Sequence, residues 1–296
     1  MFVIITDSTA DLDRPMREKL DVEYIKFTVT SGEDEYVCSL DWDEAFTAKQ
    51  FYDRMRKGEV FKTTMIQQVT YESTFEAYLK EGKDVLSVCC SSGLSGSYNA
   101  ARLAAESLRV KYPGRKLICV DALRSTGALA VLVYNASRLR AEGKTIEETA
   151  RWLEDNRMKT HQFGTVNDLI YLKRCGRVTG MVQIMSKIFN IKPIIISNTK
   201  GENQSVMKVR GRLTSLQKLI NLTKENIVNP ERQTVFISHA DCEEEARLLE
   251  KGLLEEVKCK DVYINWVNPT VGASTGPGMI GVFFCGKEVK ETATSD

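Results

Sequence analysis

One short stretch concentrates residue types that could bind or activate a ligand. Residues 91–97 read Ser-Ser-Gly-Leu-Ser-Gly-Ser, between an apolar run at residues 85–90 and an alanine-rich run typical of a helix. A turn needs only one or two such residues, so the additional hydroxyls indicate that something is held there. Where a strand leads through a glycine-containing turn into a helix, free N–H groups and the helix dipole favour an anion. This serine turn is therefore a candidate anion site.

The residues of the serine turn bear on two functional interpretations, a nucleotide-binding loop and a catalytic serine. A phosphate-binding loop is disfavoured, because the turn lacks both the Walker lysine and the three-glycine dinucleotide pattern. A serine hydrolase remains an alternative, since residues 93–97 come within one residue of the G-x-S-x-G elbow. In that case Ser95 would be the nucleophile. Of the two histidines in the chain, His239 would be the general base.

A third interpretation is a cradle of neutral donors for a carboxylate, built from hydroxyls and backbone N–H groups without an activated base. The simplest alternative is a tight turn with a serine cap on the following helix. The residues of the turn alone leave these alternatives open.

The elements around the turn predict an α/β protein. Strand-like runs at residues 2–6, 85–90 and 116–121 are each followed by a helical pattern, which predicts a parallel sheet with helices on both faces. The pattern changes after residue 158, with a predicted helix at residues 178–189 and a strand pair around residue 200. We expect two domains, a largely parallel sheet flanked by helices in residues 1–158 and a smaller α/β domain in residues 159–296. The ligand cleft would lie between them.

Composition restricts the partners. Lys and Arg number 41 against 40 Asp and Glu, a net charge of +1, so no global field attracts nucleic acid. The apolar stretches are too short for stable membrane insertion. Eight cysteines without a C-x-x-C pair favour a reducing compartment, and we expect a cytoplasmic protein with no metal or cofactor.

Several short stretches occur in a characteristic order. They are Thr-Asp-Ser-Thr-Ala-Asp-Leu at residues 6–12, Lys-Thr-Thr at 62–64, the serine turn, Leu-Lys-Arg-Cys-Gly-Arg-Val at 172–178, Lys-Pro at 192–193, Lys-Val-Arg at 208–210 and Gly-Pro-Gly at 276–278. This succession, which covers nearly the whole chain, resembles the DegV family of bacterial fatty-acid-binding proteins.

The resemblance implies a DegV-like fold of two α/β domains with a long-chain fatty acid between them. It implies that Thr63 and Ser95 hold the carboxylate, and we expect Ser92, Gly96 and Thr64 beside them. It also implies a lipid-binding protein without catalytic residues of its own. Some members present the fatty acid to a separate fatty acid kinase, which would be a further partner.

Four other positions bear on the predicted site. Arg177 is a candidate for charge near the head group, with Arg210 as a second. Met181 belongs to a helical stripe that could line the tail tunnel. Ser274 stands where the family usually has a histidine, and a hydroxyl can donate to a carboxylate but cannot carry a positive charge or shuttle a proton. This departure bears on whether the chain supports acyl phosphate formation.

Overall fold

A four-stranded parallel sheet organises the first half of the chain. The computed structural model of the 296-residue chain describes residues 2–43, 45–179 and 190–290. The strand order is β2-β1-β6-β7, and all three pairings are parallel. The strands are β1 (Phe2–Asp7), β2 (Val22–Ile25), β6 (Asp84–Cys89) and β7 (Leu117–Asp121).

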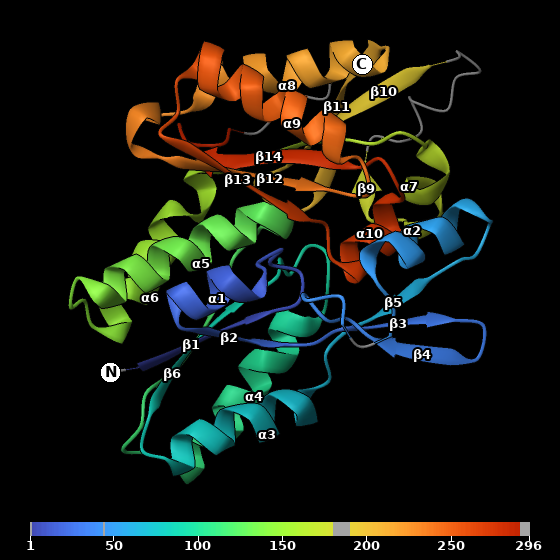
Figure 1. Cartoon of the computed structure of the whole chain (residues 1–296). Helices are drawn as coiled ribbons and strands as arrows, with labels where there is room; N and C mark the ends of the chain where they lie inside the picture. The colour runs from blue at the N-terminus through green and yellow to red at the C-terminus, as the bar shows by residue number, and fades with distance from the viewer. Residues whose placement is uncertain (1, 44, 180–189, 291–296) are drawn as a thin grey trace.

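Helices lie between successive strands of this sheet, because a parallel pair needs a crossover connection, and two more follow its last strand. They are α1 (Arg14–Leu20), α2 (Ala48–Arg56), α3 (Gln68–Lys80), α4 (Ser97–Lys111), α5 (Thr126–Ala141) and α6 (Ile146–Asn156). Figure 1 shows α3 and α4 on one face of this sheet, and α1, α5 and α6 on the other. The predicted parallel sheet flanked by helices is confirmed.

A mixed sheet of seven strands forms the second half, in the order β13-β12-β14-β8-β10-β11-β9. Its strands are β8 (Thr160–Thr165), β9 (Val178–Thr179), β10 (Ile191–Ser197), β11 (Asn203–Arg210), β12 (Thr234–His239), β13 (Asp261–Trp266) and β14 (Ile280–Cys285). Its helices are α7 (Leu169–Cys175), α8 (Arg212–Asn226), α9 (Glu243–Gly252) and α10 (Pro269–Thr275). Val178–Thr179 form a strand, so the helix predicted from residue 178 is wrong at its start. The remainder of that prediction, including Met181, lies outside the described residues.

A small antiparallel sheet lies beside the other two (Figure 1). Its order is β4-β3-β5, with β3 (Thr28–Ser31) between β4 (Asp34–Val37) and β5 (Lys62–Thr64). It carries the Lys-Thr-Thr stretch, which therefore lies on a strand.

Helix α5 packs between the two larger sheets (Figure 1). Its buried Leu129 and Leu132 share one apolar cluster with Phe236 of β12 and Phe283 of β14. Close approach requires Gly127, because a Cβ there would lie 2.3 Å from the Phe283 ring. The division at residue 158 stays a prediction, since α5 is in contact with both halves. Within the described ranges, none of the helices has the length and apolar composition needed to cross a membrane.

Candidate functional site

A cavity of about 420 Å³ lies where the sheets meet, and residues from both halves of the chain line it. The loops after β1 and β6 contribute from one half, together with β5. Helices α7 and α10 and strands β9 and β11 contribute from the other. Among the described residues that line it, Arg177 is the only one with a permanent charge, and none is a carboxylate. The cavity therefore suits an anion.

The serine turn uses most of its polar groups to hold its own shape. Backbone carbonyls, two carboxylates and two serine hydroxyls accept the N–H groups of residues 90–95 and 97. Of residues 90–97, only the Gly96 N–H has no acceptor within the described part of the chain. Of the backbone N–H groups predicted to form the cradle, only that of Gly96 is therefore left to donate to an anion. The other donors that the turn can offer are its serine hydroxyls.

Two buried aspartates accept hydrogen bonds from backbone N–H groups at the start of the turn. Asp7, at the end of β1, accepts hydrogen bonds from the Thr9 hydroxyl at 2.6 Å and the Cys90 N–H at 2.7 Å. Asp121, at the end of β7, accepts from the Ser92 N–H at 3.1 Å. Burial raises the pKa of Asp7, and the hydrogen bonds from Thr9 and Cys90 oppose that rise. Both carboxylates lie where parallel strands end at a common edge.

The side chains of the serine turn divide into two roles. Ser91 and Ser97 are buried, and Ser97 Oγ accepts a hydrogen bond of 3.1 Å from the Ile66 N–H. Ser92 and Ser95, which are both predicted site residues, line the cavity. Ser95 Oγ lies 2.9 Å from Ser97 Oγ. Because Ser97 can donate its own proton to Ser95, the Ser95 proton is available to a ligand.

The two predicted threonines are neighbours on strand β5. Thr63 pairs with Val29 and lines the cavity, whereas Thr64 pairs with Thr28. Successive residues of a strand point to opposite faces. Thr64 is accordingly outside the described lining, and only Thr63 shares the cavity with Ser95.

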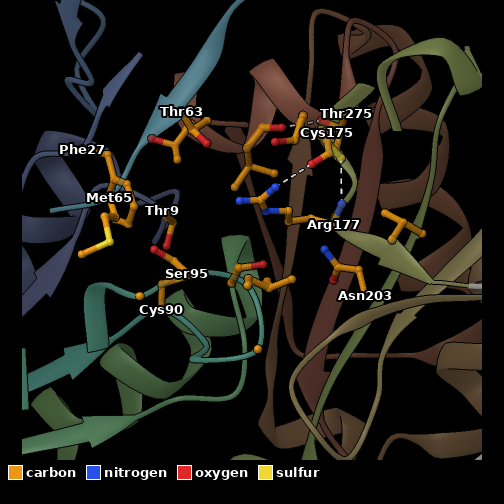
Figure 2. A pocket seen from close by; sticks show the side chains of 18 of the residues that line it. Thr9, Phe27, Thr63, Met65, Cys90, Ser95, Cys175, Arg177, Asn203 and Thr275 are labelled. Atoms are coloured by element: carbon orange, nitrogen blue, oxygen red, sulfur yellow. Dashed lines mark hydrogen bonds between the residues drawn. The ribbon is translucent and has the colours of Figure 1, made fainter. Parts of the chain in front are cut away.

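Arg177 enters the cavity from the turn after α7. Gly176 ends that helix with a φ of 62°, a left-handed conformation that favours glycine. The Arg177 guanidinium donates a hydrogen bond of 3.0 Å to the Cys175 carbonyl. Figure 2 shows its side chain reaching into the space between Thr63 and Ser95. Arg210 lies on β11, outside the described lining.

Helix α10 brings Ser274 to the same cavity. The helix begins after Asn268, whose side chain accepts from the Val271 N–H at 2.9 Å. Asn268 also donates two hydrogen bonds to Asp11, through its backbone N–H at 2.9 Å and its side-chain amide at 2.6 Å. The position of Ser274 thus depends on a contact between distant segments.

His239 does not join Ser95. It is buried at the end of β12, its ring centroid is 4.7 Å from that of Trp266, and its Nδ1 accepts from the Cys242 N–H. Burial lowers its pKa. Among the described residues that line the cavity there is no histidine. The hydroxyl next to Ser95 is that of Ser97, so the serine–histidine pair of the hydrolase alternative is not assembled.

Sequence reasoning missed several of the lining residues. Thr9 stands in the quoted Thr-Asp-Ser-Thr stretch and could have been found from its position at a strand end, whereas Asn203 and Phe27 had no local signal. Cys175 stands in the quoted Leu-Lys-Arg-Cys-Gly-Arg-Val stretch, and Ser125 follows the predicted strand at residues 116–121. The described residues include no group of three histidine, cysteine or acidic side chains arranged to hold a metal ion.

Comparison with known proteins identifies the class. The family described as "Uncharacterised protein, DegV family" matches residues 1–287. A DegV domain-containing protein of Clostridium perfringens is 36% identical over 285 residues, which cover 96% of this chain and 97% of that protein. The chain belongs to the DegV family.

Solved structures agree with this assignment. A DegV lipid-binding protein of Thermotoga maritima superposes with a TM-score of 0.85 at 27% identity, covering 98% of this chain and 100% of that chain. A second Thermotoga maritima protein, described as having a fatty acid binding function, has a TM-score of 0.82 at 27% identity and covers 95% of this chain and 98% of that chain. The predicted DegV-like α/β fold is confirmed.

Proposed function

We propose that this chain binds one long-chain fatty acid, with the carboxylate between Thr63, Ser95 and Arg177. The observation that carries the proposal is that Thr63, Ser95 and Arg177 line one cavity, and that no described residue of its lining is a carboxylate. The lipid-binding and fatty-acid-binding descriptions of the two Thermotoga maritima proteins support it.

The head group and the tail would contribute in different ways. A hydrogen bond to a charged group contributes roughly 1.5 to 3 kcal/mol when water is excluded. Each methylene removed from water contributes about 0.8 kcal/mol, so a long chain supplies most of the affinity. The hydroxyls and Arg177 would then orient the carboxylate, which any reaction at that group requires. Ser92, Gly96 and Ser274 would complete its surroundings.

We further propose that the bound acid is presented to a separate fatty acid kinase and that this chain is itself no enzyme. A second cavity, of about 550 Å³, shares Thr63, Cys175, Arg177 and Ser274 with the first. It adds Lys62 and Arg174, together with Glu59, whose charge is paired with that of Arg54. The head group would thus be approached from a basic side. Ser274 could donate a hydrogen bond there but could not shuttle a proton as a histidine does.

We propose a cytoplasmic location. All eight cysteines are free thiols, which suits a reducing compartment. Several are buried among apolar side chains, where burial raises the thiol pKa and makes the thiolate scarce. Cys38, whose pKa burial raises to about 12, is an example.

The proposal is tested by native mass spectrometry of the purified full chain, with lipid extraction of the same sample. We expect a bound or exchangeable species with the mass of a long-chain fatty acid, at one per chain. A chain that neither copurifies with nor takes up octadecanoic or octadecenoic acid would contradict the proposal.

A further inference from the structure

A separate cleft of about 550 Å³ lies between helices α5 and α6 and the second sheet, at the start of β12 and the end of β14. Helix α5 extends from the cavity of Ser95 to this cleft. Ser125, directly before α5, lines the cavity, and Arg138, near the end of α5, lines the cleft. A helix rises about 1.5 Å per residue, so these two positions are roughly 20 Å apart along it. The cleft is therefore distinct from the proposed fatty acid site.

Four cationic side chains line this basic cleft, and they come from four separate segments of the chain. They are Arg138, Lys159, Arg232 and Lys260, and all four are exposed. No described residue of the lining is a carboxylate. The whole chain has 41 basic and 40 acidic residues, so four cations without an acid are a marked local excess. A concave surface lined by one sign of charge concentrates counter-ions, and this cleft therefore attracts anions.

Three of these charges are not neutralised by the protein. Lys159, Arg232 and Lys260 form no ion pair with a carboxylate in the described part of the chain. Lys159 Nζ has only a hydrogen bond of 3.4 Å to Asn156 Oδ1. Arg138 does pair with Glu142, at 2.6 Å, where both side chains are about half exposed. Because like charges gathered in one cleft repel each other, a bound anion would relieve that repulsion.

The same cleft has an aromatic wall. Tyr134 of α5 and Trp152 of α6 are half-buried, and Phe236 of β12 is buried. The rings of Tyr134 and Phe236 meet edge to face, with their centroids 5.9 Å apart. Aromatic side chains of this kind stack on nucleobases of any type. The volume of the cleft falls within the roughly 300 to 1,000 Å³ of small-molecule sites.

We propose that the basic cleft binds a nucleotide, with its phosphates among the four cations and its base against the aromatic wall. Arginine binds a phosphate through two parallel hydrogen bonds, and lysine binds it as a point charge. The anion contacts would come from side chains and not from a loop of backbone N–H groups, so no glycine-rich motif marks this site. An inorganic phosphate would use the charges alone and leave the aromatic wall uncovered. The inference is independent of the proposed fatty acid binding.

The test is calorimetric titration of the full chain at low ionic strength, where surface charges are least screened. The probes are the diphosphates of adenosine, guanosine, cytidine and uridine, together with inorganic pyrophosphate. We expect at least one nucleoside diphosphate to bind at one per chain, about tenfold more tightly than pyrophosphate, because stacking of the base adds to the phosphate contacts.

Substitutions locate the binding site. Arg232→Gln should weaken the nucleotide about tenfold, and since this side chain is exposed, the variant should fold like the wild type. The matched control is Arg151→Gln, an exposed arginine of α6 outside the described lining, which should bind like the wild type. Trp152→Leu should weaken the nucleotide to the level of pyrophosphate and leave pyrophosphate unchanged. Thermal unfolding of each variant checks that it is folded.

The other outcomes overturn the inference. If no nucleotide binds, the cleft is a solvated basic surface. If pyrophosphate binds as tightly as every nucleotide, the cleft is an inorganic anion site only. A nucleotide that is lost in Arg177→Gln but kept in Arg232→Gln would occupy the cavity of Ser95 and not the basic cleft. Octadecanoic acid titrated into Arg232→Gln should bind as it does to the wild type, so failure of the basic cleft and failure of the proposed function are read separately.

Discussion

The hydroxyl of Ser91 donates a hydrogen bond of 2.7 Å to the carbonyl oxygen of Gly201, 110 residues further along the chain. Gly201 lies in the turn between β10 and β11 with a φ of 75°, and a Cβ there would lie 2.2 Å from Ser91 Oγ. The serine turn of the first sheet is thus fastened to the hairpin that carries Asn203 into the cavity. One of the additional serines is explained by this contact between sheets.

This contact predicts a loss of stability in Ser91→Ala. The substitution leaves the buried Gly201 carbonyl and the Gly93 N–H without their partner. We expect the free energy of unfolding, measured in urea, to fall by about 1 to 3 kcal/mol. Ser92→Ala is the control, because that side chain is exposed, and its change should stay within about 0.5 kcal/mol. Equal losses in both variants would contradict the assignment.

The alternation along β5 predicts different effects for neighbouring threonines. Thr63→Ala should weaken binding of octadecanoic acid by roughly 1.5 to 3 kcal/mol, about tenfold or more in the dissociation constant. Ser95→Ala should do the same. Thr64→Ala should leave binding unchanged, since Thr64 lies outside the described lining. A fluorescence displacement assay measures all three, and equal effects of Thr63→Ala and Thr64→Ala would reject this placement.

The charge of Arg177 predicts discrimination between an acid and its ester. Arg177→Gln should weaken octadecanoic acid about tenfold and leave methyl octadecanoate nearly unaffected, because only the acid carries a charge to pair. Arg210→Gln, on β11, is the matched control and should bind both ligands like the wild type. Calorimetry or dye displacement provides the comparison. Parallel losses for acid and ester would mean that Arg177 acts through the shape of the cavity.

The raised pKa of the buried Asp11 carboxyl group predicts that the stability of the chain depends on pH. Burial raises its pKa from 3.8 to about 6, opposed by hydrogen bonds from Asn268. The folded state therefore holds the Asp11 proton more tightly than the unfolded state does. The resulting contribution to the free energy of unfolding is fully present below pH 3.8 and is lost as the pH rises through about 6. Relative to Asp11→Asn, the wild-type free energy of unfolding should fall by about 3 kcal/mol over that window. Urea titrations at both ends of the window measure the difference, and a constant difference would disprove it.

The separation of Ser95 from the histidines predicts that the chain is inert to serine hydrolase reagents. Without a general base beside it, the Ser95 hydroxyl keeps the low nucleophilicity of an ordinary alcohol. A fluorophosphonate probe should label the native chain no more than it labels Ser95→Ala. Labelling that disappears both in Ser95→Ala and in His239→Ala would revive the hydrolase alternative.

Much of the site could be predicted because it lies at the ends of parallel strands. Ser95 and Thr9 follow strands whose carboxyl ends meet at one edge, and the order of short stretches pointed to Thr63. Thr64 was expected beside Thr63, because a threonine-rich segment interpreted as a polar connection has no defined face until it pairs with β3. Asn203 enters through a hairpin turn that carries no chemical motif.

By itself, the amino-acid sequence determined the parallel α/β framework and the serine turn with its surplus hydroxyls, because these follow from periodicity and local turn chemistry. Only the tertiary structure decided which hydroxyls line the cavity and which hold the chain together. Ser91 reaches Gly201, and Asp11 reaches Asn268, 257 residues away. Such contacts depend on how sheets and helices pack, and local sequence does not encode the distances between segments so far apart.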